Sequence, residues 1–170
     1  MADLTRGRVI AKVRAGESLE GADLSGLDIT GANLSSGDLK GANLKGANLT
    51  GAYLTGTYLE GASLERADLK SARLRSANLS EANLSGAKLI RTDMSGANLS
   101  GANLSDADLS DANLWKANLT GANLLHANLT RALMAMANLR GANLIQADLT
   151  ETQLIRAELT DTILPEGFEE

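Results

Sequence analysis

The chain has 170 residues and a formal net charge of −5, with no cysteine, one proline and one histidine. The absence of cysteine excludes disulfides and thiolate metal sites, and the acidic balance argues against a general nucleic-acid binder, which usually carries a basic face. Leu and Ala supply 31 and 27 residues while aromatic residues make up 2%, so the interior has to be regular, because few large side chains are available to fill irregular gaps.

The first 16 residues precede the regular pattern and are expected to form an N-terminal cap. Val9, Ile10 and Val13 occur at helical spacing, and Gly16 fits the end of a helix. The sequence therefore predicts a short amphipathic helix within residues 5–16; the alternative is a disordered start. The segment lacks an apolar stretch of signal-peptide length, and no run in the chain approaches the ~18 apolar residues of a membrane span. We expect a cytoplasmic protein that makes no membrane contact.

Residues 17–164 repeat with a period of five. Steps of five from Leu19 to Leu164 give 30 positions with no insertion or deletion, and 27 of them are Leu. Ala occupies 23 of the 29 positions found two residues earlier, and Asn or Asp lies between the two at 20 of 30 positions. Ser or Thr, often with Gly behind it, follows the Leu. The repeating unit is therefore Ala-(Asn/Asp)-Leu-(Ser/Thr)-Gly.

Neither a long helix nor a long strand buries this pattern. A helix turns ~100° per residue, so a step of five moves each Leu ~140° around the axis. Side chains alternate along a strand, so an odd period sends successive Leu residues to opposite faces. A very short strand with Ala and Leu pointing inward, followed by a corner at Ser/Thr-Gly, buries every pair. Repetition of that unit coils the chain, with each coil hydrogen-bonded to the next, which is a β-solenoid.

The tandem pattern resembles the pentapeptide-repeat family over residues 17–164. The resemblance implies an all-β fold, a right-handed quadrilateral β-helix with four pentapeptides per coil. The sequence itself predicts about 30 uninterrupted repeats behind a short helical cap. At the ~4.8 Å spacing of strands, the rod would be ~36 Å long. Leu would then stack on Leu every 20 residues, and Ala would be needed in the narrow bore. Leu27 is the main departure, and a Thr at that inner position could bond a neighbouring carbonyl.

Little in the sequence points to catalysis. His126 is interpreted as a solvated corner residue, and no base is placed to activate the many Ser and Thr hydroxyls. Asp106, Asp108 and Asp111 form an acidic cluster, but it lacks the Gly-rich spacing of calcium-binding β-helix repeats and the bidentate Glu of an EF-hand. We therefore expect no enzymatic activity, no catalytic residues, no cofactor and no metal.

One column of outward residues departs from the polar pattern of the others. Residues 20 apart should stack, and Trp115 and Ile155 fall in the same column, with Leu133 and Met136 on the same side. Exposed apolar groups can mark a partner site, and Trp is common among interface anchors; the alternative is stacking between coils. A second column adds two residues, so that the candidate partner surface comprises Trp115, Leu133, Met136, Ile155, Leu125 and Ile145.

Residues 165–170 are expected to form a C-terminal tail. Pro165 cannot donate to a β-ladder, and Phe168 could fold over the last coil. Acidic residues also gather here: Glu166, Glu169 and Glu170. Several members of the family dimerise through this end, so the resemblance implies a second role for the apolar residues. The candidates for an end cap or a homodimer contact are Ile163, Leu164 and Phe168.

These features lead to two hypotheses for the function. The first is a non-catalytic structural or protein-interaction scaffold with an unknown protein partner and no direct contact with nucleic acid. The second comes from the resemblance to a family abundant in bacteria, notably cyanobacteria: a DNA-mimicking inhibitor or protector of DNA gyrase or topoisomerase IV. Against the second, no loop interrupts the repeats, and basic residues crowd the middle of the chain: Arg66, Lys70, Arg73, Arg75, Lys88 and Arg91.

Overall fold

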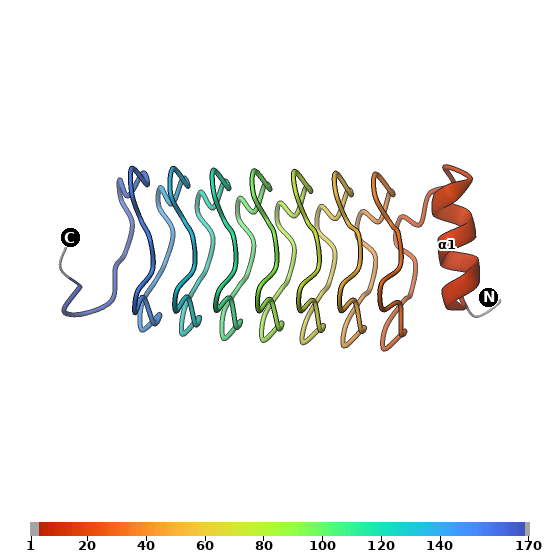
Figure 1. The fold of residues 1–170 in the computed structure, drawn as a ribbon, viewed down its shortest axis with the longest axis horizontal. Helices are drawn as coiled ribbons and strands as arrows, with labels where there is room; N and C mark the ends of the chain where they lie inside the picture. Colours follow the sequence, from red (N-terminus) through yellow and green to blue (C-terminus); the bar gives the residue numbers. More distant parts are fainter. Residues whose placement is uncertain (1–3, 169–170) are drawn as a thin grey trace.

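The computed structural model describes residues 4–168, which form a straight rod along which the coils follow one another in chain order (Figure 1). Helix α1, Arg6–Arg14, lies across the N-terminal end, and regular coils follow it. No helix in residues 4–168 combines the length and the apolar character that crossing a bilayer requires.

The coils are joined by parallel β-bridges of one residue each, and residues 4–168 contain no longer strand. Every bridge joins a residue to the one 20 positions further on, from Asp23–Asn43 to Asn143–Ile163. The Leu24 N–H donates to the Asn43 carbonyl (2.7 Å), and the Asn43 N–H donates to the Ala22 carbonyl (2.9 Å). A 20-residue register means four five-residue units per coil, which confirms the coil size implied by the resemblance.

A β-turn forms each corner. At the corner that follows Leu24, the Leu24 carbonyl accepts a bond from the Leu27 N–H (3.2 Å), and Gly26 has a φ of 64°. A positive φ at the third turn position is typical of type II turns and favours glycine. Sixteen non-glycine residues in the described part of the chain, among them Arg66 and Met136, also adopt a positive φ. Coil stacking therefore imposes the turn geometry even where the residue type does not favour it.

Each five-residue unit contributes two inward side chains to the core, and each of them stacks on its equivalents in the neighbouring coils. Every Leu, Ile or Met at the five-residue step from Leu19 to Leu144 is at most 3% exposed, and the Ala residues of the second inward column are equally buried from Ala32 to Ala142. Thr57 replaces Ala at one buried position, and its Oγ1 donates to the Leu34 carbonyl (2.9 Å). Thr92, Thr152 and Thr162 also bond carbonyls, which confirms the role expected for Thr there.

Helix α1 covers the first coil. Val9, on the inner side of this helix, is fully buried, and Leu4, Ile10 and Val13 pack against the core. Gly37 replaces Ala at a position that contacts the helix: a Cβ there would lie 3.2 Å from Val13 Cγ1 and 2.9 Å from the Leu34 carbonyl oxygen. The missing methyl group makes room for the helix, which explains one break in the repeat.

Within residues 4–168, no helix covers the opposite end of the rod. Leu149, Leu154 and Leu159 are only partly buried, although their equivalents in earlier coils are fully enclosed. Leu27, the large residue in the Ala column, is half-buried in the first coil. Among the described residues, the rod thus has a capped N-terminal end and an open C-terminal end.

Candidate partner-binding groove

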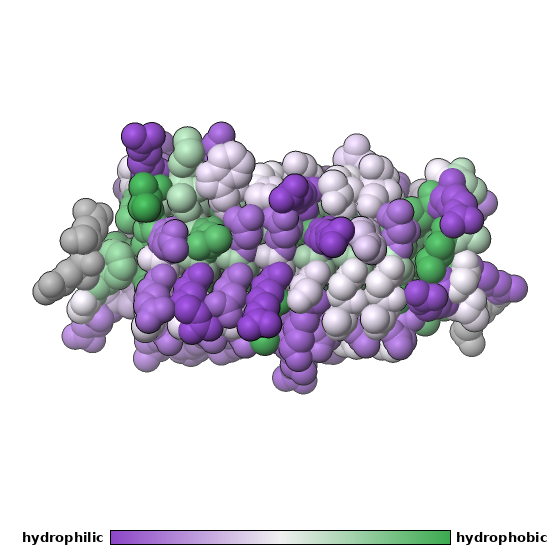
Figure 2. Space-filling model, viewed as in Figure 1, coloured by the Kyte–Doolittle hydropathy of each residue, from purple (hydrophilic) through white to green (hydrophobic). Residues whose placement is uncertain are grey.

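Four of the six candidate partner residues come together on one side of the rod. This side contains one face, formed by every twentieth residue from 33 to 153. It also contains the adjacent corner, formed by every twentieth pair from 35–36 to 155–156. We call this side the Trp115 wall. On it, Trp115 is 45% exposed, Leu133 39%, Met136 46% and Ile155 67%. Figure 2 shows apolar surface toward the C-terminal end and again at the N-terminal end, with mostly polar surface in the middle of the rod.

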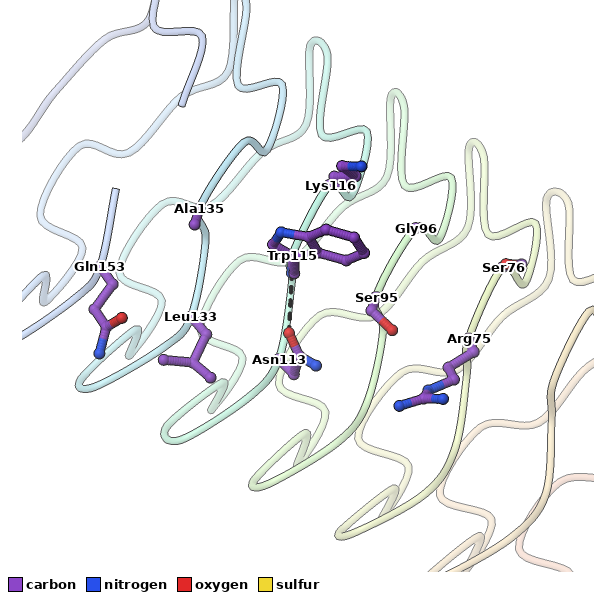
Figure 3. A pocket seen from close by; sticks show the side chains of 10 residues that line it. All are labelled: Arg75, Ser76, Ser95, Gly96, Asn113, Trp115, Lys116, Leu133, Ala135 and Gln153. Atoms are coloured by element: carbon purple, nitrogen blue, oxygen red, sulfur yellow. Dashed lines mark hydrogen bonds between the residues drawn. The ribbon is translucent and has the colours of Figure 1, made fainter. Parts of the chain in front are cut away.

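A shallow groove of about 550 Å³ lies in this wall and crosses several coils (Figure 3). Met136 and Ile155 belong to the coils at its C-terminal side, where the Met136 N–H donates to the Ile155 carbonyl (2.9 Å). The groove is lined by Arg75, Ser76, Ser95, Gly96, Asn113, Trp115, Lys116, Leu133, Ala135 and Gln153.

The backbone of Trp115 is held from both sides. Its N–H donates to Asn113 Oδ1 (3.1 Å), the bond drawn in Figure 3, and its carbonyl accepts from the Gly96 N–H (2.8 Å). Lys116 Nζ lies 4.3 Å from the centre of the indole ring, within cation–π range. The ring thus projects from a fixed corner and carries a positive charge over its face.

The N-terminal end of the groove is polar and internally paired. Arg75 Nε lies 2.5 Å from Asp93 Oδ2, and Asn113 Nδ2 donates to Asp93 Oδ1 (3.3 Å). Partial burial acts to raise the pKa of Asp93, but hydrogen bonds from Ser95 and Arg75 outweigh it and hold that pKa below its ordinary value. Asp93 is therefore a charged, occupied partner of Arg75.

The other two candidate partner residues lie elsewhere. Leu125 and Ile145 occupy the corner two units away from Trp115 in the four-unit coil, which is diagonally across the rod. Ile145 is 40% exposed, whereas Leu125 is half-buried. The six residues therefore form two separate surfaces, of which the Trp115 wall holds the larger apolar area.

The acidic cluster is spread over three sides of the rod. Asp106 lies at the corner of His126, Asp108 on the next face, and Asp111 at the corner beyond it. The Asp106 and His126 side chains approach to 3.2 Å, and His126 Nε2 lies 2.7 Å from Gln146 Oε1. Asp111 is bound by Arg131 Nε (2.7 Å), and this guanidinium lowers the pKa of Asp111.

The C-terminal candidates flank the open end of the rod. Ile163 is 53% exposed, and Leu164 and Phe168 are half-buried. The Phe168 N–H donates to the Pro165 carbonyl (3.2 Å), which turns the chain after the last coil. Glu166 is exposed, and the remaining acidic residues predicted for the tail, Glu169 and Glu170, lie outside the described residues.

The Asn and Asp residues of the repeat have a structural role that was not predicted from the sequence. Asn33 Oδ1 accepts a bond from the Ser35 N–H (3.1 Å), and the same local contact recurs along the rod. Amides also form ladders between coils: Asn98 Nδ2 donates to Asn78 Oδ1 (3.1 Å), and Asn118 Nδ2 donates to Asn98 Oδ1 (3.1 Å). Short side chains that bond backbone two residues on are typical of Asx-turns, and this signal was available in the fixed spacing.

We expect these turns to make stability depend on pH. The hydroxyl and N–H of Thr150 lower the pKa of Asp148, so the folded-state pKa lies below the unfolded one. The stabilisation is therefore complete above the unfolded pKa and is lost as pH falls through the folded pKa. Urea unfolding at pH 7 and pH 3 should show a smaller loss for Asp148→Asn, which keeps the acceptor oxygen but cannot titrate. Equal losses in the two proteins would refute this.

The 20-residue register, the enclosed Leu core and the polar walls define a non-globular β-helical repeat protein. A family model described as "Pentapeptide repeats", with eight copies, matches overlapping segments that together run through residues 17–165. The chain therefore belongs to the pentapeptide-repeat family. The matched segments are 17–46, 47–86, 67–106, 77–115, 97–135, 107–144 and 127–165.

Solved structures of the same family resemble the chain. Rfr23, a pentapeptide-repeat protein from the cyanobacterium Cyanothece 51142, is 46% identical over 54% of this chain, with a TM-score of 0.53. The chain covers 63% of that structure, less than two thirds of its length. HetL, from the cyanobacterium Nostoc sp. strain PCC 7120 and involved in heterocyst differentiation regulation, is 30% identical over 99% of this chain and 100% of its own, with a TM-score of 0.45.

A third structure is more distant. QnrB1, a plasmid-mediated fluoroquinolone resistance protein, is 21% identical over 82% of this chain and 71% of its own, with a TM-score of 0.48. No curated protein sequence gives a significant match.

Proposed function

We propose that the chain is a non-catalytic protein-interaction scaffold: a right-handed rod of about 30 uninterrupted repeats that binds a partner protein at the Trp115 wall. In this proposal residues 1–16 are the cap, 17–164 the rod and 165–170 the tail. The observation that carries it is the gathering of Trp115, Leu133, Met136 and Ile155 around one groove on a rod whose repeat positions are mostly polar on the outside.

Two features of this groove support binding over simple wall stacking. Stacking would bury the apolar groups against one another, yet all four remain at least 39% exposed. Large exposed apolar groups grouped on one side of a folded protein are typical of interaction sites. Among the polar residues of the groove, the Ser95 hydroxyl is engaged in a turn, where its Oγ donates to Asp93 Oδ1 (2.8 Å), which fits a structural role.

The proposal is tested by replacing the indole. We expect Trp115→Ala to leave the free energy of unfolding within about 1 kcal/mol of the wild type, because nearly half the ring is exposed. Binding of partner proteins from a cell extract should fall by about tenfold or more, since a central aromatic anchor is typically worth ~2 kcal/mol. Urea unfolding and quantitative pull-down measure the two quantities.

Tyr58→Ala is the matched control. Tyr58 is 48% exposed on a different face, with Lys40 Nζ 5.7 Å from its ring, so it resembles Trp115 in exposure and in its cationic neighbour. We expect this variant to bind as the wild type does. A large loss of stability in Trp115→Ala with unchanged capture would instead identify the column as stacking between coils.

The open C-terminal end supports a second contact, a homodimer. The N–H of Leu139 donates to the Glu158 carbonyl (2.9 Å) in the coil that follows it, whereas within residues 4–168 the N–H groups of Leu154 and Leu159 have no backbone partner. Partly exposed core and free backbone donors at one end favour stacking on another chain. In this proposal Ile163, Leu164 and Phe168 contribute to the contact.

A charged side chain introduced at the C-terminal end of the rod should prevent two chains from forming the homodimer. We expect Ile163→Arg to convert a wild-type dimer into a monomer, because the contact would bury the added guanidinium without a partner. Light scattering after size exclusion measures the mass of each protein. Ile145→Arg changes a residue of similar type on the side of the rod and should leave the mass unchanged. A wild type that is monomeric at high concentration would rule the homodimer out.

The DNA-mimic hypothesis rests on the rod shape and the net charge of −5. Charges of opposite sign alternate in the middle of the rod, where Lys45 pairs with Glu65 (2.9 Å) and Arg75 with Asp93. Such a surface lacks the continuous negative charge of duplex DNA. Inhibition of gyrase supercoiling at low micromolar protein would favour the mimic over the scaffold.

A further inference from the structure

The Trp115 wall has the opposite charge to the chain as a whole. It carries four cationic side chains, Arg73, Arg75, Lys116 and Arg156, against the single carboxylate of Asp93, a local charge of +3 on a chain of net charge −5. Only Arg75 is engaged in an ion pair within the described residues. Arg73 lies over the Tyr53 ring (4.7 Å) and Lys116 over Trp115, so both keep their charge available to a ligand.

The backbone N–H and carbonyl groups of the Trp115 wall are already hydrogen-bonded between coils, so an added β-strand would find no backbone partner there. The Leu114 N–H donates to the Leu133 carbonyl (2.8 Å), and the Leu133 N–H donates to the Ala112 carbonyl (2.9 Å). The next coil continues in the same way, with the Met134 N–H on the Gln153 carbonyl (2.9 Å). Because the backbone groups are consumed between coils, strand addition is excluded here, and recognition has to run through side chains.

The spacing of the coils matches a helix better than an extended peptide. Adjacent coils are ~4.8 Å apart, so the groove from Arg75 to the level of Ile155 is ~19 Å long. A helix rises 5.4 Å per turn, so ~13 residues span that length with one apolar group near each coil. An extended chain repeats every ~6.7 Å and falls out of step with the coils.

We propose that the groove binds an acidic amphipathic α-helix of a partner protein, lying along the rod axis. This inference rests on the proposed function and specifies the partner. The helix packs an aliphatic stripe against Trp115, Leu133 and Ile155, and Asp or Glu residues beside that stripe meet Lys116 and Arg156. A second copy of this chain does not supply such a helix, because α1 contains four cationic residues and no acidic one.

Trp115 is the only tryptophan in the chain, so its emission reports on the groove directly. The probe is a tryptophan-free peptide of about 18 residues, locked as a helix by side-chain lactams, with Leu along one stripe and Glu on both flanks. A second peptide has Lys in place of Glu, and a third keeps the Glu residues but scrambles the Leu stripe. A 20-base-pair DNA duplex is included as a polyanion without an apolar stripe.

We expect the acidic helix to shift the Trp115 emission to shorter wavelength and to bind at least tenfold more tightly than the basic or the scrambled peptide. Lys116→Glu should weaken the acidic peptide by about tenfold. Lys40→Glu, which changes the lysine that lies over Tyr58, should have no effect. Equal binding of the acidic and basic peptides, the absence of an emission shift, or tighter binding of the duplex would each overturn the proposal.

The outcome separates this inference from the proposed function. If Trp115→Ala abolishes partner capture while the acidic helix does not bind, the wall is an interaction site but its ligand is not an acidic helix. If Trp115→Ala leaves partner capture unchanged, the scaffold function proposed for this wall is refuted. The peptide titration then still decides whether the groove binds an acidic helix.

Discussion

Replacing Leu99 with alanine is expected to lower the free energy of unfolding by about 2–5 kcal/mol. Leu99 is fully buried in the middle of the rod, and the register stacks it between Leu79 and Leu119. Each coil contacts only its two neighbours, and both are held by backbone bonds such as that from the Leu99 N–H to the Asn118 carbonyl (2.7 Å). The walls of the new cavity therefore cannot collapse to fill it. Urea unfolding measures the loss.

Leu125→Ala is the matched comparison, because it removes the same atoms from a half-buried corner. We expect this variant to lose about 1 kcal/mol or less, since less apolar surface returns to water. A loss below 1 kcal/mol for Leu99→Ala would mean that the coils adjust to the cavity, and the stacked core would then contribute less to stability than its burial indicates.

The core could be predicted from the sequence because its pattern is local. A step of five excludes long helices and strands, and the side chains that this step selects, from Leu19 to Leu144, are the ones that the structure encloses. The number of units per coil is a non-local property, since it depends on which residue the bridge from Asp23 reaches. That number came from the resemblance and was confirmed by the bridges.

Breaks in the repeat depended on contacts far apart in the sequence. Gly37 looks like a random departure until Val13 of α1 is placed against it. Positive φ values at residues such as Arg66 and Met136 run against residue preference, because the stacked coils dictate the turn. Neither feature has a signal in the neighbouring residues, although the Asx-turns do.

The candidate groove was predictable once a 20-residue column was assumed. Trp115 and Ile155 fall in one column, and Leu133 and Met136 lie beside it. The positive charge of the Trp115 wall was harder to predict. The basic residues noted in the sequence are close in the chain but lie on several sides of the rod, with Arg66 at one corner and Arg91 at another. Only the register shows that Arg73, Arg75, Lys116 and Arg156 share a side.

Placing an aspartate at Val9 is expected to detach α1 from the rod. Val9 is fully buried, and an unpaired carboxylate at such a site costs several kcal/mol, so the free energy of unfolding should fall by about 3 kcal/mol or by the whole docking energy of the helix, whichever is smaller. Detachment would expose the first coil, where Leu19 and Leu24 are at present at most 3% exposed. Binding of a hydrophobic dye and proteolysis near residues 4–16 should both increase.

Ala11→Asp separates docking from helix propensity, because Ala11 lies on the exposed side of the same helix and receives the same new residue. We expect this variant to bind no more dye than the wild type, since its carboxylate stays in water. The rest of the rod should keep its β-helical circular dichroism in both variants, because coils distant from the cap depend only on their neighbours. Complete unfolding of the Val9→Asp protein would instead show that the cap is required to nucleate the coils, and that the repeats cannot hold their register alone.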